Sequence, residues 1–243
     1  MLGKRLFDIV AALTGLLFAS PVLLPTMFLV WWHDRHSPFY IAPRVALGGG
    51  TFSMVKLRSM VKGADRTGVD STGANDLRIT RVGHFIRRYK LDEITQLWNV
   101  LLGDMSVVGP RPNVKRETDH YTEIERGLLG IRPGITDFAS IVFADEGDIL
   151  APFQDADLAY NQLIRPWKSR LGLFYVKHRG FWLDLELCLL TILCIFARSM
   201  ALRMVAQRLD DLGADEALVR VALRQQVLSP TPPPGATSVV TVR

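Results

Sequence analysis

The stretch IVAALTGLLFASPVLLPTMFLVWW, residues 9–32, contains no charged residue. It is longer than the roughly 20 residues that a helix needs to cross the hydrocarbon core of a bilayer. A cleavable signal peptide has a shorter apolar region followed by a small-residue cleavage site. We therefore expect this segment to stay on the protein as a membrane anchor.

Two prolines, Pro21 and Pro25, interrupt the anchor, and Ser20 precedes the first of them. A proline removes one backbone hydrogen bond from a helix, and a nearby hydroxyl can satisfy the freed carbonyl in lipid. We predict a bend at Ser20 and Pro21.

Basic residues flank the anchor on both sides: Lys4 and Arg5 before it, and Arg35, Arg44, Lys56 and Arg58 after it. Cytoplasmic flanks of membrane segments are enriched in such residues. The pattern favours a re-entrant helix over residues 1–36 that enters and leaves the bilayer on the cytoplasmic face. A straight span kinked by proline is the alternative.

The composition fits partial residence in a membrane. Apolar residues make up 49% of the chain and charged residues 22%, with a mean hydropathy of +0.18. The chain is too polar for a multi-span transporter and more apolar than is usual for a soluble enzyme. A net charge of +5 and a pI near 9.4 suit anionic partners such as lipid headgroups or nucleotide phosphates. Because the bases are spread along the chain without a nucleic-acid-binding motif, we expect no nucleic-acid partner.

Downstream of the anchor, the sequence predicts an α+β fold that is mainly helical. Residues 39–45 and 51–57 are apolar-rich and are separated by three glycines, which is typical of a β-hairpin. Residues 64–75 are small and polar and predict a mobile loop. The two cysteines lack the spacing of a metal site or a disulfide framework, so we expect reduced packing residues.

Two short helices are expected to meet near residues 90–92, because apolar residues between positions 85 and 101 recur at helical spacing. The VVGPRP segment, residues 107–112, predicts a rigid irregular loop that holds Arg111. The RPGIT segment, residues 132–136, predicts a turn.

The C-terminal part divides by composition. Residues 181–197 are apolar but carry two acidic residues, so they favour a helix in the membrane interface or in a core rather than a span. We assign residues 37–205 to a catalytic domain with interfacial amphipathic helices, 206–228 to an amphipathic helical extension and 229–243 to a disordered tail.

The densest charged cluster is RRYKLDE, residues 87–93, followed by Asp104 and Arg111. A phosphoryl-transfer site requires an oxygen nucleophile, a metal ligand and arginines that hold phosphate oxygens. Adjacent carboxylates such as Asp92 and Glu93 can share a Mg²⁺ ion with substrate phosphates. Acidic residues in a first helical turn are also favoured by capping alone, so a purely structural role is the alternative.

The stretch RITRVGHFIRRYKLDEITQLWNVLLGDMSVVGPRP, residues 78–112, resembles the signature of the monotopic phosphoglycosyl transferases, a family of bacterial sugar transferases. KRLFDIV at 4–10, KLRSM at 56–60 and RPGIT at 132–136 follow the same family order. The resemblance extends over roughly the first 200 residues and implies a small form of the enzyme. Thr95 stands where many members carry proline.

The resemblance implies transfer of a phosphosugar from a UDP-sugar to undecaprenyl phosphate, with release of UMP, as the first step of surface-glycan or glycoprotein synthesis. It implies Asp92 as the nucleophile that forms an aspartyl phosphosugar. It also implies that Asp92 and Glu93 bind Mg²⁺ and that Arg87 and Arg111 bind phosphate.

The serine and proline of the bend, here Ser20 and Pro21, would turn the anchor back into the cytoplasmic leaflet of the bacterial inner membrane. Asp8, Lys56 and Arg58 also match the family, and we assign them a structural role first. Membrane lipids, and a second copy of the chain in a homo-oligomer, are further partners that we consider. A catalytically idle membrane scaffold is the rival interpretation, against which the intact Asp-Glu pair argues.

Overall fold

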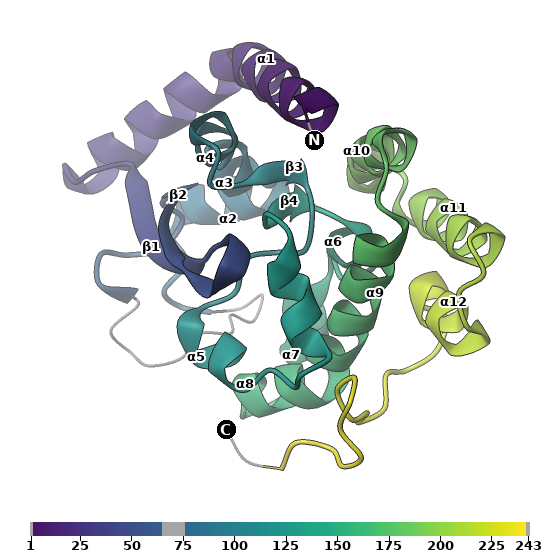
Figure 1. The fold of residues 1–243 in the computed structure, drawn as a ribbon. Coiled ribbons are helices and arrows are strands. Elements are labelled where there is room, and N and C mark those ends of the chain that lie inside the picture. The colour runs from purple at the N-terminus through teal and green to yellow at the C-terminus, as the bar shows by residue number, and fades with distance from the viewer. Residues whose placement is uncertain (1, 65–75, 242–243) are drawn as a thin grey trace.

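The computed structural model describes residues 2–64 and 76–241, so nearly all of the loop expected at 64–75 lies outside the described residues. The described chain is mainly helical, with a two-stranded antiparallel hairpin and a two-stranded parallel pair. This confirms the predicted α+β class with a mainly helical domain and a small hairpin. Figure 1 shows the N-terminal helix lying along one side of a body of shorter helices.

Helix α1 (Leu2–Asp34) is continuous in spite of its two prolines. Pro21 has no N–H for the Leu17 carbonyl, and the Ser20 hydroxyl donates to that carbonyl at 2.8 Å. In Figure 1 the helix changes direction along its length and ends where β1 begins. Among the described residues, α1 is the one helix that is long and apolar enough to cross a membrane. Its re-entrant course stays a prediction.

The predicted hairpin is confirmed with the same bounds. Strands β1 (Phe39–Val45) and β2 (Thr51–Leu57) pair antiparallel, and the short 3₁₀ turn η1 (Leu47–Gly49) joins them. Gly48 and Gly49 have φ angles of 77° and 87°, which glycine adopts without steric cost. The tight connection therefore depends on the glycine run.

Three short helices replace the two expected around residue 90: α2 (Arg81–Arg88), α3 (Leu91–Ile94) and α4 (Leu97–Leu102). The Thr80 side chain caps α2 by accepting a hydrogen bond from the Gly83 N–H. Lys90 is left-handed, with φ 52° and ψ 30°, so the chain turns sharply between α2 and α3. The break between α3 and α4 at residues 95–96 is slight, because Thr95 and Gln96 keep helical backbone angles. The spacing of apolar residues does not predict such a break.

The expected VVGPRP loop and RPGIT turn overlap a parallel strand pair, β3 (Ser106–Val108) with β4 (Gly134–Thr136). Each strand has three residues, too few for an alternating pattern in the sequence. The pairing joins segments that are distant along the chain, so only the folded structure shows it.

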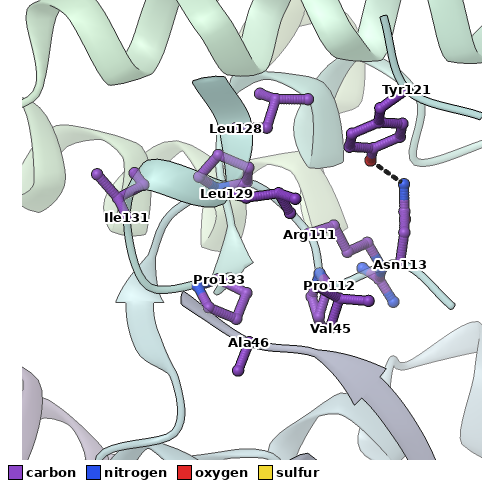
Figure 2. Close-up of a pocket in the computed structure, with 11 residues that line it drawn as sticks. Val45, Ala46, Arg111, Pro112, Asn113, Tyr121, Leu128, Leu129, Ile131 and Pro133 are labelled. Carbon is purple, nitrogen blue, oxygen red and sulfur yellow. Dashed lines mark hydrogen bonds between the residues drawn. The ribbon is translucent and has the colours of Figure 1, made fainter. Parts of the chain in front are cut away.

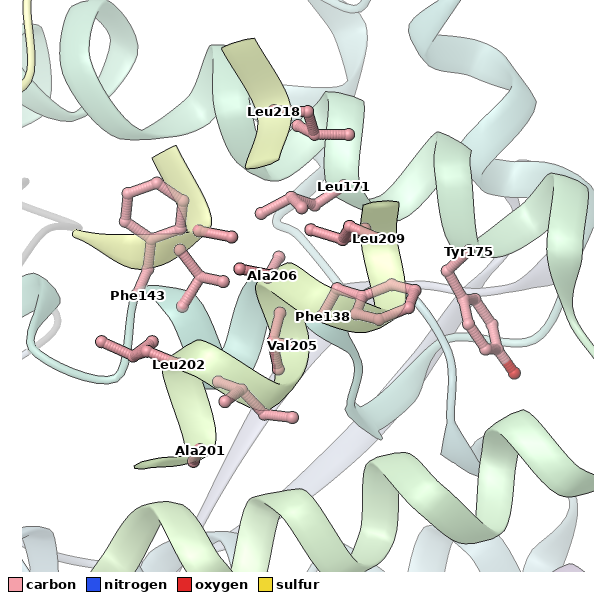
Figure 3. Packing of buried hydrophobic residues seen from close by; sticks show 14 of the residues in the cluster. Phe138, Phe143, Leu171, Tyr175, Ala201, Leu202, Val205, Ala206, Leu209 and Leu218 are labelled. Atoms are coloured by element: carbon pink, nitrogen blue, oxygen red, sulfur yellow. The ribbon is translucent and has the colours of Figure 1, made fainter. Parts of the chain in front are cut away.

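The remaining elements are helices, most of which pack around the main core. They are α5 (Lys115–Asp119), η3 (Glu125–Gly130), α6 (Phe138–Val142), α7 (Glu146–Leu150), α8 (Ala156–Ala159), the π-helical η4 (Tyr160–Ile164), α9 (Arg165–His178), α10 (Phe181–Phe196), α11 (Arg198–Asp211) and α12 (Glu216–Leu223). Figure 3 shows the core where α6, α9, α11 and α12 meet, with Phe138, Leu171 and Leu209 at its centre. Cys188 and Cys194 in α10 are free thiols, as expected.

The region assigned to an amphipathic extension, residues 206–228, forms the end of α11 and the separate helix α12. Leu209, Leu218 and Ala222 are buried in the main core, so the extension packs as part of the domain. The described part of the segment assigned to a tail, 229–241, has no helix or strand. Hydrogen bonds nevertheless join it to Thr122, Gln162 and Arg170.

Candidate active site

The turn at Lys90 places two carboxylates side by side at the start of α3. Asp92 and Glu93 occupy the first turn of this helix, and both are half-buried. The Thr95 hydroxyl lies 3.1 Å from the Asp92 carbonyl and 3.2 Å from the Val55 carbonyl of β2, and it donates between them. Thr95 thereby joins α3 to the hairpin.

Glu93 is paired with Arg111 across the site. The Arg111 Nη2 lies 2.5 Å from the Glu93 Oε1, and the two side chains are 31% and 16% exposed. Burial opposes ionisation of Glu93, but the Arg111 guanidinium outweighs it and holds the pKa of Glu93 well below its usual range. The charge of Glu93 likewise raises the pKa of Arg111. Both groups are therefore charged at neutral pH.

Asp92 differs from its neighbour. Its carboxylate accepts no hydrogen bond from the residues that the structure describes. Burial raises the pKa of Asp92, the Glu93 charge raises it further, and the cations of Lys56, Arg111 and Arg87 oppose the rise. The Asp92 oxygens are thus unoccupied by hydrogen bonds from the described residues, and three cations lie near them.

The three cations come from three different elements. Lys56 lies on β2, Arg87 in α2 and Arg111 in the segment after β3. The Arg87 Nε donates to the Ser59 hydroxyl at 3.0 Å, and burial lowers the pKa of Arg87. Burial and the nearby Arg111 charge lower the pKa of Lys56 to about 8. This constellation can hold phosphate oxygens around the Asp92 carboxylate.

The segment carrying Arg111 is fixed by a close backbone approach. The Gly109 N–H donates to the Thr136 carbonyl and the Gly134 N–H to the Pro110 carbonyl, each at 2.9 Å. A Cβ atom on Gly134 would lie 2.1 Å from the Gly109 nitrogen, so glycine is required there. Arg111 is therefore presented on a rigid segment, as the proline-rich motif predicts.

The start of α1 binds the same region. Asp8, 3% exposed, accepts hydrogen bonds from the Ser106 hydroxyl at 2.9 Å and the Val107 N–H at 3.0 Å. Arg5 donates to the carbonyls of Val100 and Leu101 at 2.5 and 2.7 Å. The anchor helix is thus joined to the backbone that leads into Arg111.

The four residues that the sequence predicts for the catalytic site lie together here: Arg87, Asp92, Glu93 and Arg111. Asp104 instead lies after α4, with its carboxylate 3.3 Å from the Asn99 side-chain nitrogen. Ser20 and Pro21 belong to α1 and form no part of the cluster.

Arg58 pairs with Asp34 at 2.5 and 2.6 Å, which joins the end of α1 to the hairpin and gives Arg58 a structural contact. From the sequence we expect a structural role for Lys56. The structure instead places its charge beside Asp92 and Glu93. The family match at Lys56 is the only sign in the sequence that this residue matters. The register of β2 shows that it belongs to the site.

Sequence reasoning missed an ion pair between Glu146 of α7 and Lys168 of α9. Burial opposes ionisation of Glu146, but Lys168, Arg111 and Lys90 outweigh it and lower its pKa. The Glu146 charge in turn helps to raise the pKa of Arg111. No motif marks either residue, so the sequence carries no signal for them.

A pocket adjoins Arg111 (Figure 2). It is a small, partly open hollow between the end of β1, the proline segment and η3. The Asn113 side-chain amide donates to the Tyr121 hydroxyl at 2.6 Å in its wall, and the other lining side chains apart from Arg111 are apolar. The hollow thus presents an apolar surface beside the Arg111 guanidinium.

Asp92 and Glu93 are the two carboxylates of this site that could serve as ligands to Mg²⁺. No group of three or more His, Cys, Asp or Glu side chains that could hold a metal occurs among the described residues. Mg²⁺ in phosphoryl-transfer sites takes one or two carboxylates and completes its shell with phosphate oxygens and water. The Glu93 Oε2 and both Asp92 oxygens accept no hydrogen bond from the described part of the chain, so they are open to such an ion.

Comparison with known proteins gives one family. The family described as bacterial sugar transferase matches residues 1–198. The UDP-N-acetylgalactosamine-undecaprenyl-phosphate N-acetylgalactosaminephosphotransferase of Aeromonas hydrophila is 32% identical over 192 residues, which cover 78% of this chain and 42% of that protein. The UDP-glucose:undecaprenyl-phosphate glucose-1-phosphate transferase of Klebsiella pneumoniae is 32% identical over 196 residues, covering 79% of this chain and 40% of that protein.

An uncharacterized sugar transferase of Bacillus subtilis (strain 168), EpsL, is 33% identical over 192 residues, covering 79% of this chain and 86% of that protein. The chain therefore spans about two fifths of the length of the first two relatives and most of the third. The names of the first two specify different sugars, so the shared chemistry is in the phosphate transfer.

Proposed function

Because the chain belongs to the bacterial sugar transferase family, we propose that it transfers a phosphosugar from a UDP-sugar to undecaprenyl phosphate and so initiates synthesis of a glycoconjugate. The observation that carries this proposal is the free Asp92 carboxylate beside Lys56, Arg87 and the Glu93–Arg111 pair. A carboxylate without a hydrogen-bond partner, held among cations, suits attack on a phosphorus atom that is itself surrounded by negative charge.

In the first step, an Asp92 oxygen attacks the β-phosphorus of the UDP-sugar. A phosphorus–oxygen bond forms to Asp92, the bond between the β-phosphorus and the oxygen bridging to the α-phosphate breaks, and UMP leaves with that electron pair. Lys56, Arg87 and Arg111 hold phosphate oxygens and stabilise the charge that moves to the leaving group. Glu93 orients Arg111 through their 2.5 Å contact.

In the second step, a phosphate oxygen of undecaprenyl phosphate attacks the same phosphorus, and the bond to Asp92 breaks. The product is a polyprenyl diphosphosugar, and the Asp92 carboxylate is regenerated. Dividing the reaction into two displacements lets the water-soluble donor and the lipid acceptor use the site in turn.

Mg²⁺, held by Asp92 and Glu93 together with donor phosphates, would supply additional positive charge for the departing UMP. We assign the nucleoside part of the donor to the surface over the hollow beside Arg111, where a nucleobase face can lie against the apolar walls and near the Asn113 amide. Replacing Asn113 by Leu should then weaken inhibition by UMP. Unchanged inhibition would contradict this placement.

We place the reaction at the cytoplasmic face of the inner membrane, with α1 as a re-entrant anchor bent at Ser20 and Pro21. The exposed apolar side chains of α1, such as Leu17 at 71% and Phe18 at 79%, support burial of this helix in lipid. Cysteines introduced at Gly3 and Ser37 should both be labelled from the cytoplasmic side. Labelling of the two positions from opposite sides would show a straight span.

The activity test uses purified protein in detergent with undecaprenyl phosphate, Mg²⁺ and a panel of UDP-sugars. The proposal predicts release of UMP from at least one of them, and loss of that release in an Asp92→Asn variant. A folded wild-type protein that binds UDP-sugar but releases no UMP with any member of the panel would favour an idle scaffold.

A further inference from the structure

A second set of buried charges lies behind the segment that carries Arg111. The Lys4 Nζ of α1 lies 2.5 Å from the Asp184 Oδ2 of α10 and 3.3 Å from the Val108 carbonyl of β3. The Tyr175 hydroxyl of α9 lies 2.5 Å from the Asp184 Oδ1 and 3.2 Å from the same Val108 carbonyl. Side chains from two helices therefore reach one carbonyl of β3, and Asp184 from a third helix contacts both of them.

The number of protons on Tyr175 and Lys4 determines which contacts each side chain can make as a donor. The Tyr175 hydroxyl has one proton, and the shorter contact directs it to Asp184. The Lys4 ammonium has three protons and can donate to Asp184 and to Val108 together. Lys4 is thus the group that holds the carbonyl, while Asp184 holds Lys4 and Tyr175 holds Asp184.

Burial makes this arrangement rigid. Asp184 is 2% exposed and Tyr175 is fully buried, whereas Lys4 keeps about a third of its surface exposed. A buried carboxylate without its cation partner is costly, so the Lys4–Asp184 pair strongly favours one position of α1 against α10. Phe7 and Phe181, whose ring centroids lie 5.6 Å apart, fasten the same two helices.

The Val108 carbonyl, which Lys4 and Tyr175 contact, lies close to the active site along the chain. Val108 lies three residues before Arg111. Between them, Gly109 and Pro110 are fixed by backbone hydrogen bonds with β4 and its flanking residues. If the Val108 carbonyl moves, Arg111 therefore moves with it, because the segment between them is rigid.

We propose that Lys4, Asp184 and Tyr175 form a positioning unit, in which the anchor helix α1 sets the place of Arg111 and with it the binding of the donor diphosphate. The inference rests on the proposed function, because it assigns Arg111 to the donor phosphates. It gives the anchor helix a role in substrate binding in addition to attachment.

The test compares kcat and KM for the UDP-sugar in protein purified in detergent, where bilayer topology has no influence. Lys4→Met and Asp184→Asn each remove the ion pair. We expect each to raise KM for the donor roughly tenfold with a smaller change in kcat, since a displacement of about 1 Å can cost about 100-fold. The double variant should be no worse than the more impaired single variant, because both changes act on one unit.

Glu186→Gln is the matched control. Glu186 lies on the same helix as Asp184 and pairs with Arg208 at 2.7 Å, at a site that does not touch β3. It should leave KM unchanged. Circular dichroism melting of all variants measures how much folded protein each sample contains.

A merely structural role would lower apparent kcat through loss of folded enzyme and leave KM at the wild-type value, and that result would overturn the proposal. Additive effects of the two single variants would also overturn it. Failure of the proposed function is distinguishable, since the wild type would then release no UMP from any donor.

Discussion

Lys56 should control the alkaline limit of the donor half-reaction. Its pKa is lowered to about 8 by burial and by the Arg111 charge, so its ammonium loses a proton within the accessible pH range. Between pH 7 and pH 9, the protonated fraction of such a group falls from about 0.9 to about 0.1. If the charge is needed to hold the donor diphosphate, kcat/KM for the UDP-sugar should fall about tenfold across this interval.

Replacing Lys56 by Met removes this titration. The variant should have a lower kcat/KM, which changes less than about twofold between pH 7 and pH 9 because no ammonium is lost. Its acidic limb should move to higher pH, since Lys56 lowers the pKa of Asp92 and attack requires the ionised carboxylate. In the wild type, burial already raises the pKa of Asp92, so activity falls as pH decreases through a value above that of an ordinary aspartate.

The assay is initial-rate release of UMP at low donor concentration. In a two-step displacement, kcat/KM for the donor reports the free enzyme and the first step. Lys177→Met, a change at an exposed lysine at the end of α9, is the control and should keep the wild-type profile. A tenfold alkaline fall that persists in Lys56→Met would refute the assignment of this limb to Lys56.

Three further outcomes follow from the geometry. Arg111→Met should lower kcat/KM for the donor by about 10- to 150-fold, the value of one or two charge-assisted hydrogen bonds, whereas Arg132→Met at an exposed position should leave UMP release unchanged. Gly134→Ala should destabilise the fold by about 1–3 kcal/mol and weaken donor binding, because its Cβ would lie 2.1 Å from the Gly109 nitrogen; a wild-type melting temperature and KM would contradict the rigid-segment argument. Thr80→Ala should lower the free energy of unfolding by about 1 kcal/mol, because the cap of α2 is lost. Thr80→Ser should keep the cap and the wild-type stability, and thermal melting measures both.

Local patterns predicted the elements whose signals lie within one stretch of chain. The anchor helix follows from uninterrupted apolar residues, and the Ser20 hydrogen bond to the carbonyl freed by Pro21 follows from the chemistry of that pair. The hairpin follows from two apolar runs around a glycine turn. Each of these depends on neighbours in the sequence.

Features that depend on distant partners were missed. The β3–β4 pair joins two three-residue segments that have no periodicity of their own. The Lys4–Asp184 contact joins residues separated by 180 positions. Burial of α12 in the main core depends on its packing against α11 and α9, which the polar appearance of the extension concealed.

For the site, the resemblance supplied Arg87, Asp92, Glu93 and Arg111, and the structure brings these four together. The resemblance distinguishes Asp92 from Glu93, but the residue pattern alone does not, because the different surroundings of the two carboxylates depend on which one Arg111 reaches. Arg111 pairs with Glu93 and leaves Asp92 free. The contributions of Lys56 and Glu146 likewise depend on the register of β2 and the packing of α7.

The most direct measurement is intact-protein mass spectrometry after mixing the enzyme with UDP-sugar and Mg²⁺ in the absence of a lipid acceptor. The wild type should gain the mass of one phosphosugar, release about one equivalent of UMP and lose the added mass when undecaprenyl phosphate is supplied. Asp92→Asn should show neither the added mass nor UMP. An adduct that persists in Asp92→Asn, or turnover with acceptor and no adduct on the wild type, would contradict covalent transfer through this carboxylate.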